Sequence, residues 1–176
     1  MNAANEIKFP GFTLVSVTNP SATHLDELAR RLHLEPIDLA ETNSPAKRTW
    51  LETHPQYARL VTLWPTYRKS SRDIRPAELS FFLRPEVLLV LQRGELPAFA
   101  ELIHQYAASA ELREHISERT PERLLYVLIA HLYQSLFPMI NHLIDDCDTI
   151  EHEIFSSRER QLIPQILAIR RNITDV

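Results

Sequence analysis

The 176-residue sequence predicts an α/β domain in which a mixed or mostly antiparallel sheet is flanked by helices, an αβα sandwich, with long helices at its C-terminal end. Three observations predict this fold. Short β-branched and aromatic segments joined by tight turns fill the first half of the chain, and the second half carries apolar residues at helical spacing. The chain is also long enough to bury a core without a disulfide or a structural metal.

The composition excludes several classes of function. Gly11 and Gly94 are the only glycines, so the glycine-rich loops that bind phosphates in nucleotide-binding folds are absent. The single cysteine, Cys147, excludes an intrachain disulfide and a cysteine-based zinc site. A net charge of −4 disfavours nucleic acid as a partner. No nucleophile–base pair or cofactor cradle is recognisable, and we therefore expect that the protein is not an enzyme.

The first elements follow from local patterns. The alternating, β-branched segment Phe12–Thr18 predicts a strand. Ser21 or Thr23 is a suitable N-cap for a helix whose apolar positions lie within Leu25–Leu32. A proline at the first helical position predicts a second, short helix over Pro36–Glu41.

A strand meander follows. Thr53-His54-Pro55 and Arg84-Pro85-Glu86 predict tight turns, and the polar segment Tyr67–Pro76 predicts a loop. Leu88–Leu91 is apolar on both faces, which predicts a central strand. The four strands are expected at Lys47–Glu52, Tyr57–Trp64, Glu78–Arg84 and Val87–Gln92.

From residue 96 onward the pattern is helical. Helices are predicted over Leu96–Ala108 and Ala110–Ser117, and Thr120-Pro121-Glu122 has the capping residues of a third helix near Pro121–Phe155. That helix would be about 52 Å long, which exceeds the ~16 Å radius of gyration of a compact domain of this size. We therefore divide the chain at residue 120 into an α/β part, 1–120, and a helical part, 121–176. The apolar stripe of the long helix consists of Ile129, Leu132, Leu136, Met139, Leu143, Cys147, Ile150 and Ile154.

The ends of the chain give two expectations. Arg158–Val176 is predicted to be helical and has no stop signal, so we expect a domain cut from a longer protein. The N-terminus lacks the features of a signal peptide, and the apolar runs Val87–Leu91 and Leu124–Ala130 are shorter than the ~20 residues of a membrane helix. We therefore expect this sequence not to span a membrane.

The densest polar cluster lies on the long helix. Asp145, Asp148 and His152 fall on one helical face, and carboxylate oxygens are ligands that hard cations such as Mg²⁺ prefer. The alternative is an ordinary solvated face beside the apolar stripe. Cys147 occupies a stripe position and is expected to pack rather than to react.

The order of these features resembles the cytosolic domain of CorA-type magnesium channels. His33–Ala46 is similar to the helix and "RPK" region of that family, with Ser44 in place of the usual arginine. Tyr57–Trp64 resembles its "Y-x-F-I-V-L" strand, and Thr120–Phe155 is similar to its long acidic helix. Ile166–Ile173 resembles the start of its stalk helix, into which the C-terminal helices would lead.

The resemblance implies a function in divalent-cation transport. The full-length protein would be a homopentamer at the cytoplasmic face of the membrane, and its cytosolic part would sense Mg²⁺ at subunit interfaces. Glu95 would be an interfacial acid, and Asp145 and Asp148 would lie near a second ion. The membrane helices, the Gly-Met-Asn signature and the partner acid would lie beyond Val176. This chain would then be soluble, monomeric or weakly associated, and would bind ions weakly.

Two alternatives stay open. Zinc-transporting relatives share the same cytosolic pattern, so the resemblance does not name the cation, which could also be cobalt. From another class, the chain could be a soluble helical interaction module without an ion role. Two apolar stretches of ~20 residues beyond Val176 would favour the channel.

Overall fold

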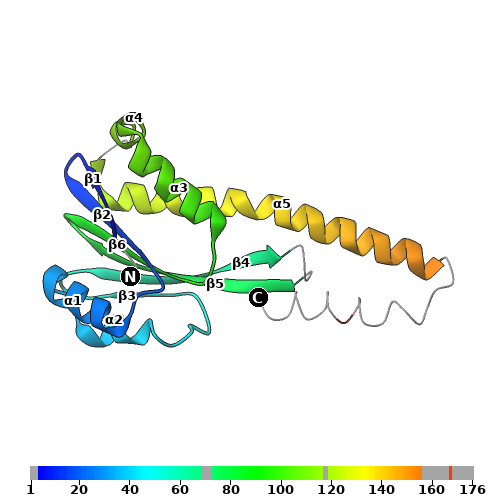
Figure 1. Ribbon diagram of the computed structural model, residues 1–176, viewed down its shortest axis with the longest axis horizontal. Coiled ribbons are helices and arrows are strands. Elements are labelled where there is room, and N and C mark those ends of the chain that lie inside the picture. The colour runs from blue at the N-terminus through cyan, green and yellow to red at the C-terminus, as the bar shows by residue number, and fades with distance from the viewer. Residues whose placement is uncertain (1–3, 69–72, 117–118, 156–166, 168–176) are drawn as a thin grey trace. The chain divides into compact units, whose positions relative to one another are not determined.

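The computed structural model describes residues 4–68, 73–116, 119–155 and 167 of the chain (Figure 1). These residues divide into two compact units. Unit 1 comprises Met1–Trp64 and Ala77–Ala130, and unit 2 comprises Pro65–Pro76 and His131–Val176. Each unit is described by itself.

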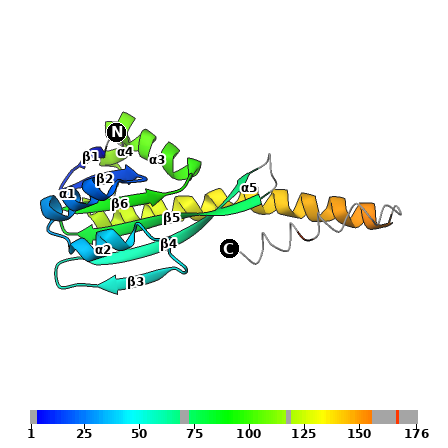
Figure 2. The ribbon, with the colours of Figure 1, turned by 60° about the horizontal axis from the view of Figure 1, so that its bottom comes forward.

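Six strands form one mixed sheet in the order β1-β2-β6-β5-β4-β3 (Figure 2). The pairs β1–β2, β5–β6 and β3–β4 are antiparallel, whereas β2 and β6 are parallel. The apolar strand β6 lies between β2 and β5, which confirms its predicted central position. The strands are β1 (Asn5–Phe9), β2 (Phe12–Thr18), β3 (Trp50–Thr53), β4 (Ala58–Arg68), β5 (Asp73–Arg84) and β6 (Val87–Arg93).

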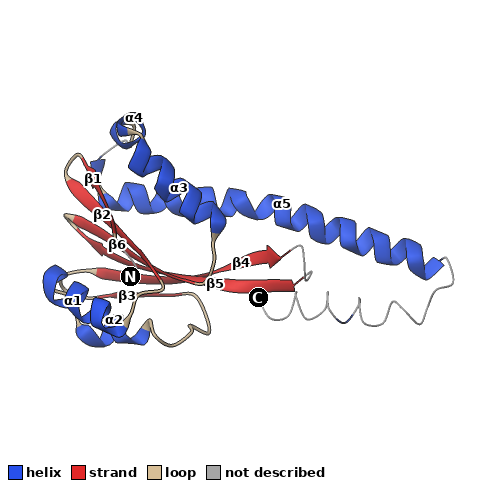
Figure 3. Ribbon diagram, viewed as in Figure 1, coloured by secondary structure: helices blue, strands red, loops and turns tan. Residues whose placement is uncertain are grey.

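Helices cover both faces of the sheet in unit 1, as the predicted sandwich requires (Figure 3). The helices α1 (Ala22–Leu32) and α2 (Pro36–Glu41) lie on one face, and α3 (Pro97–Ala108) and the first turns of α5 (Pro121–Phe155) lie on the other. The short helix α4 (Ala110–Glu114) follows α3. The core beneath α1 and α2 includes Val15, Val17, Leu25, Leu28, Leu39, Tyr57, Phe82, Leu89 and Leu91.

The predicted helix starts are confirmed by their caps. The Ser21 side chain accepts a hydrogen bond from the His24 N–H at 3.3 Å at the start of α1. Pro36 opens α2, and α2 ends at Glu41, as predicted. At the start of α5, the Arg123 N–H donates to Thr120 Oγ1 at 3.3 Å. Satisfying these first-turn donors is what fixes where each helix begins.

The strands differ from the predicted ones in three places. The strand predicted over Lys47–Glu52 is observed as β3, Trp50–Thr53, and so begins later. The sequence does not predict the strand β1, because only Ile7 and Phe9 in it are apolar and buried. Its pairing with β2 supplies the rest of its stabilisation. The predicted loop Tyr67–Pro76 is too long, since β4 continues to Arg68 and β5 begins at Asp73. A hydrogen bond joins the two extended strands here: Thr66 Oγ1 donates to the Arg75 backbone carbonyl at 2.8 Å.

The long helix α5 runs from Pro121 to Phe155 and continues through Pro138, which confirms the predicted element. Cys147 was expected to pack along its apolar stripe, but its side chain is exposed. The predicted helix over Arg158–Val176 lies outside the described residues, except for Leu167.

Among the described helices, α5 is long and apolar enough over Pro121–Thr149 to cross a membrane by length and composition, with a mean hydropathy of 1.3. Core helices of soluble proteins can have the same length and composition, so these two properties do not identify a membrane-spanning helix.

Candidate functional site

Glu95 lies in the connection between β6 and α3, in unit 1. The backbone before it is fixed by two hydrogen bonds: the Gly94 N–H donates to Asn19 Oδ1 at 3.1 Å, and Gln92 Nε2 donates to the Gly94 carbonyl at 2.8 Å. The residue after it, Leu96, is buried. The connection is thus anchored on both sides, and it holds the Glu95 side chain at the surface.

The acidic stretch of α5 has two environments within unit 2. Asp145 and Asp148 are exposed, and their separation of three residues places them side by side on the helix surface. Asp146 faces the strand hairpin instead, where its Oδ2 accepts a hydrogen bond from the Tyr67 hydroxyl at 2.9 Å. The Tyr67 ring also stacks on His142, with 5.9 Å between ring centroids.

The three predicted metal ligands are therefore not assembled into one site within either unit. Asp145 and Asp148 share an exposed helix face in unit 2, and Glu95 belongs to unit 1. A pair of carboxylates on one helix turn can bind a hydrated hard cation, but it supplies two of the six or more oxygen ligands that such a cation takes. The remaining ligands would be water or side chains from another chain.

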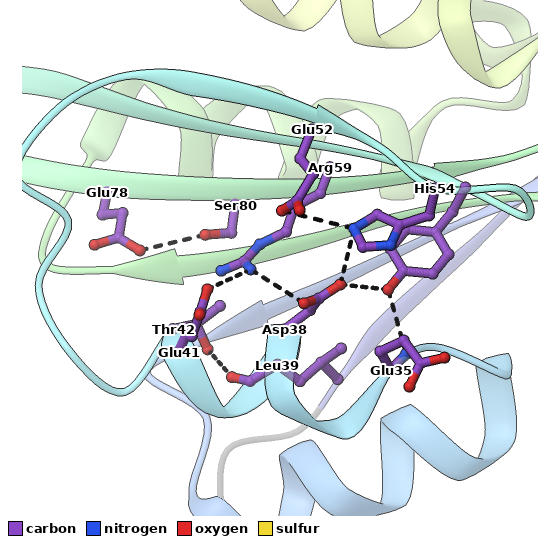
Figure 4. Close-up of polar contacts among 11 residues, drawn as sticks. Glu35, Asp38, Leu39, Glu41, Thr42, Glu52, His54, Arg59, Glu78 and Ser80 are labelled. Atoms are coloured by element: carbon purple, nitrogen blue, oxygen red, sulfur yellow. Dashed lines mark hydrogen bonds and ion pairs between the residues drawn. The ribbon is translucent and has the colours of Figure 1, made fainter.

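A second polar centre lies in unit 1, where α2 meets β3 and β4 (Figure 4). Asp38 on α2 is buried and accepts a short hydrogen bond from the Tyr57 hydroxyl. The Glu35 N–H donates to the same hydroxyl at 3.3 Å. Burial, followed by the hydrogen bond to Asp38, raises the pKa of Tyr57 to about 12. The phenol therefore keeps its proton and holds the Asp38 carboxylate in place.

Arg59 on β4 balances part of the negative charge at this centre. Its guanidinium is 2% exposed and lies 2.8 Å from Glu41 Oε2 and 3.7 Å from Asp38 Oδ1. It also stacks over the Trp50 ring at 4.5 Å from the centroid. A buried guanidinium in this position requires nearby carboxylates, because an isolated buried charge is costly.

Glu52 on β3 and His54 in the turn after β3 complete the polar centre. His54 Nε2 lies 3.2 Å from Asp38 Oδ2 and 3.6 Å from Glu52 Oε2. The His54 ring stacks on Tyr57, with centroids 4.4 Å apart and planes 15° apart. The predicted tight turn is confirmed by a hydrogen bond from the His54 N–H to the Tyr57 carbonyl at 2.8 Å.

Sequence reasoning missed this centre. The sequence predicts only a turn at His54, and no motif links this residue to Asp38, which lies on a different element. The available signal was modest: Glu52 and His54 are two residues apart at the end of a strand, so they point to the same side. The packing of α2 on the sheet is what brings Asp38 to them.

A comparison with models of known protein families shows the family to which the chain belongs. The model of the family described as "CorA-like Mg2+ transporter protein" matches residues 10–176. The chain belongs to this family. The resemblance stated from the sequence is thereby confirmed, and the CorA-like family is one of transporters rather than of enzymes.

One curated relative is the cobalt/magnesium transport protein CorA of Thermotoga maritima. The two sequences are 20% identical over 162 residues, which cover 90% of this chain and 45% of that protein. The chain therefore spans less than half the length of this CorA relative.

Solved structures confirm the predicted fold class. The soluble domain of CorA from Methanocaldococcus jannaschii matches with a TM-score of 0.77 at 16% identity, covering 93% of this chain and 63% of that chain. The ZntB cytoplasmic domain from Vibrio parahaemolyticus matches with a TM-score of 0.64 at 10% identity, covering 94% of this chain and 66% of that chain. At these identities the likeness to CorA and ZntB establishes the fold.

Proposed function

We propose that this chain is the cytosolic regulatory domain of a CorA-like magnesium channel and that it senses intracellular Mg²⁺ at subunit interfaces. The whole protein would be a homopentamer, held in the membrane by helices that follow this chain. Glu95, Asp145 and Asp148 would contribute to the ion sites. The observation that carries the proposal is the combination, on one helix of a CorA-like domain, of an exposed acidic pair and an exposed apolar row.

The apolar row supports association with other subunits. Tyr133, Phe137, Ile140 and Ile144 are between 43% and 64% exposed and recur at steps of four, three and four residues. This spacing is typical of a helix that packs lengthwise on another helix. Exposed apolar rows of this kind mark interaction surfaces, and a second copy of the chain presents the same row.

The exposed acids supply the dependence on ions. Asp145 and Asp148 repel each other and would repel carboxylates of a neighbouring subunit. A bound divalent cation removes this repulsion and so stabilises the closed assembly. When the intracellular Mg²⁺ concentration falls, the ions dissociate, the repulsion returns and the assembly opens.

Two alternatives rest on separate observations. The chain shares its fold with the ZntB cytoplasmic domain, and this fold would equally suit a zinc-transporting protein in which Zn²⁺ replaces Mg²⁺ in these roles. The exposed apolar row alone would suit a helical interaction module without an ion role. A stabilising effect of Mg²⁺ that depends on the three acids separates the channel domain from this module.

The test is thermal unfolding with and without Mg²⁺. Binding to the folded state raises stability by mass action, and ten times the dissociation constant gives about 1.4 kcal/mol. For a chain of this size, this is a rise in melting temperature of about 3–6 °C. We expect millimolar Mg²⁺ to produce a rise of this order or smaller, and the triple variant E95A/D145A/D148A to lose it.

A matched control replaces three exposed acids outside the proposed sites, Glu27, Glu86 and Glu114 of unit 1, with alanine. This variant changes the net charge equally and should respond to Mg²⁺ as the parent does. An equal response of parent, triple variant and control would show that the three acids are ordinary solvated residues. The same titration with Zn²⁺ compares the two cations.

A further inference from the structure

We propose that Asp38, Glu52 and His54 form a binding site for a divalent transition metal of the zinc class, separate from the acids assigned to Mg²⁺. The three residues come from α2, β3 and the turn after β3, all within unit 1 (Figure 4). The site is independent of the proposed sensing of Mg²⁺, because it shares no residue with it.

The geometry fits a metal ion without rearrangement of the backbone. One ligand atom from each residue lies within 4.8 Å of the other two. His54 Nε2 is 3.2 Å from Asp38 Oδ2 and 3.6 Å from Glu52 Oε2. Zinc bonds of ~2.0–2.2 Å in a tetrahedral site separate neighbouring ligand atoms by about 3.3–3.6 Å. The two measured separations bracket this value closely.

An unsatisfied atom points to the same ligand. His54 Nε2 is buried from solvent and has no hydrogen-bond partner among the described residues, although it faces two carboxylates. Leaving a buried polar nitrogen unsatisfied costs about 1–3 kcal/mol. The stacking of the ring on Tyr57 fixes this orientation. A metal between the nitrogen lone pair and the carboxylate oxygens would satisfy all three groups.

The surrounding charges also fit a divalent cation. The centre holds three carboxylates and one guanidinium: Asp38 and Glu41 lie against Arg59, and Glu52 lies against His54. With neutral His54, this group has a surplus of two negative charges, which one divalent ion neutralises. The Tyr57 hydroxyl donates to Asp38 and so orients a ligand from outside the coordination sphere, as is usual around protein-bound metals.

The ligand types indicate which ions the site would bind. Mg²⁺ prefers oxygen ligands in octahedral geometry, whereas imidazole suits zinc, copper, nickel and iron. Glu52 is 48% exposed, so an ion can enter from solvent and water can occupy a fourth position. We therefore expect Zn²⁺ and Co²⁺ to bind, and millimolar Mg²⁺ not to displace them.

The experiment is a titration of the 176-residue chain with Co²⁺, followed by its visible absorption and by displacement with Zn²⁺. All proteins carry Cys147→Ser, because Cys147 is exposed and thiolates bind the same ions. We expect saturable binding of one equivalent of Co²⁺ with the intense bands of tetrahedral coordination. His54→Gln and Glu52→Gln should each weaken binding by about tenfold or more. The controls His104→Gln and Glu86→Gln, at exposed positions of unit 1, should bind as the parent does.

A second measurement needs no ligand variant. In the long-range ¹H–¹⁵N spectrum of the parent, Zn²⁺ should shift the His54 ring nitrogen more than those of the other seven histidines. Unchanged affinity in both His54→Gln and Glu52→Gln, or an unshifted His54 ring at saturating Zn²⁺, would overturn the proposal. In that case the imidazole pairs with the two carboxylates through a proton. Neither result alters the Mg²⁺ response expected for Glu95, Asp145 and Asp148.

Discussion

At the residue scale, unit 1 concentrates its buried charge where α2 meets the sheet. Asp38 is buried, and its carboxylate is held by the Tyr57 hydroxyl and by the nearby Arg59 guanidinium. The pair of Arg59 with Glu41 extends this group to the surface, since Glu41 is 57% exposed. Because these partners are mutually dependent, the protonation of one residue affects the stability that the others provide.

Tyr57 gives a pH-dependent prediction. Its pKa is about 12 in the folded chain and 10.0 in the unfolded chain, chiefly because of burial and then because of its hydrogen bond to Asp38. Above pH 10 the unfolded chain loses this proton and the folded chain keeps it, so the free energy of unfolding falls as the pH rises from 10 towards 12. Below pH 10 this contribution is fully present.

Urea unfolding at about pH 9 and about pH 11 measures the effect. Tyr57→Phe should reduce the loss of stability between the two pH values, since no proton is then bound at this position in either state. Tyr133→Phe, at an exposed position, is the control and should leave the loss unchanged. An equal loss in the parent and in Tyr57→Phe would contradict the assigned pKa.

At the element scale, the long helix α5 combines two environments. Leu124 and Leu128 are fully buried in unit 1, whereas Tyr133 and Phe137 are more than half exposed in unit 2. The helix therefore owes its stability in unit 1 to packing on the core, and its apolar surface in unit 2 remains available for a partner.

Leu128→Ala tests the packing of the first turns of α5. Leu128 is 0% exposed, and truncation of a fully buried leucine costs about 2–5 kcal/mol through lost burial and the cavity left behind. Tyr126→Ala, two residues earlier and 61% exposed, should cost less than about 1 kcal/mol. Urea unfolding measures the loss of stability in both variants. Equal losses would show that the helix does not pack as described.

Most elements could be predicted from sequence because each carries its own local signal. Ser21 and Thr120 are caps, Pro36 and Pro121 occupy first helical positions, and β2 and β6 are rich in β-branched or apolar residues. The strand β1 lacks such a signal and exists because β2 pairs with it. The extra length of β4 and β5 likewise depends on pairing between polar residues, which periodicity does not detect.

The candidate sites were less predictable than the fold. The acidic pair Asp145 and Asp148 is visible in sequence because both residues lie on one helix. The exposure of Cys147 is not visible in the sequence, because the spacing of apolar residues along a helix does not show which side of the helix another element covers. The group of Asp38, Glu52 and His54 needed three-dimensional packing, since its members come from three separate segments.

At the scale of the whole molecule, the chain belongs to the CorA-like family, and the role proposed for it depends on its exposed surface. The exposed carboxylates would bind the ion, and the exposed apolar row of α5 would bind a neighbouring subunit. An interface that needs both is sensitive to the Mg²⁺ concentration, because loss of the ion leaves like charges opposed. The division of the chain into the parts 1–120 and 121–176 remains a prediction.

A ¹H–¹⁵N NMR titration of the chain with Mg²⁺ tests whether Glu95, Asp145 and Asp148 bind this ion. Low-affinity oxygen sites bind in the millimolar range. We predict saturable shifts in that range for the amides of these three residues, exceeding those of the exposed acids Glu27 and Glu114. If the three residues shift no more than Glu27 and Glu114, Mg²⁺ does not bind them selectively, and the proposed ion sites are wrong.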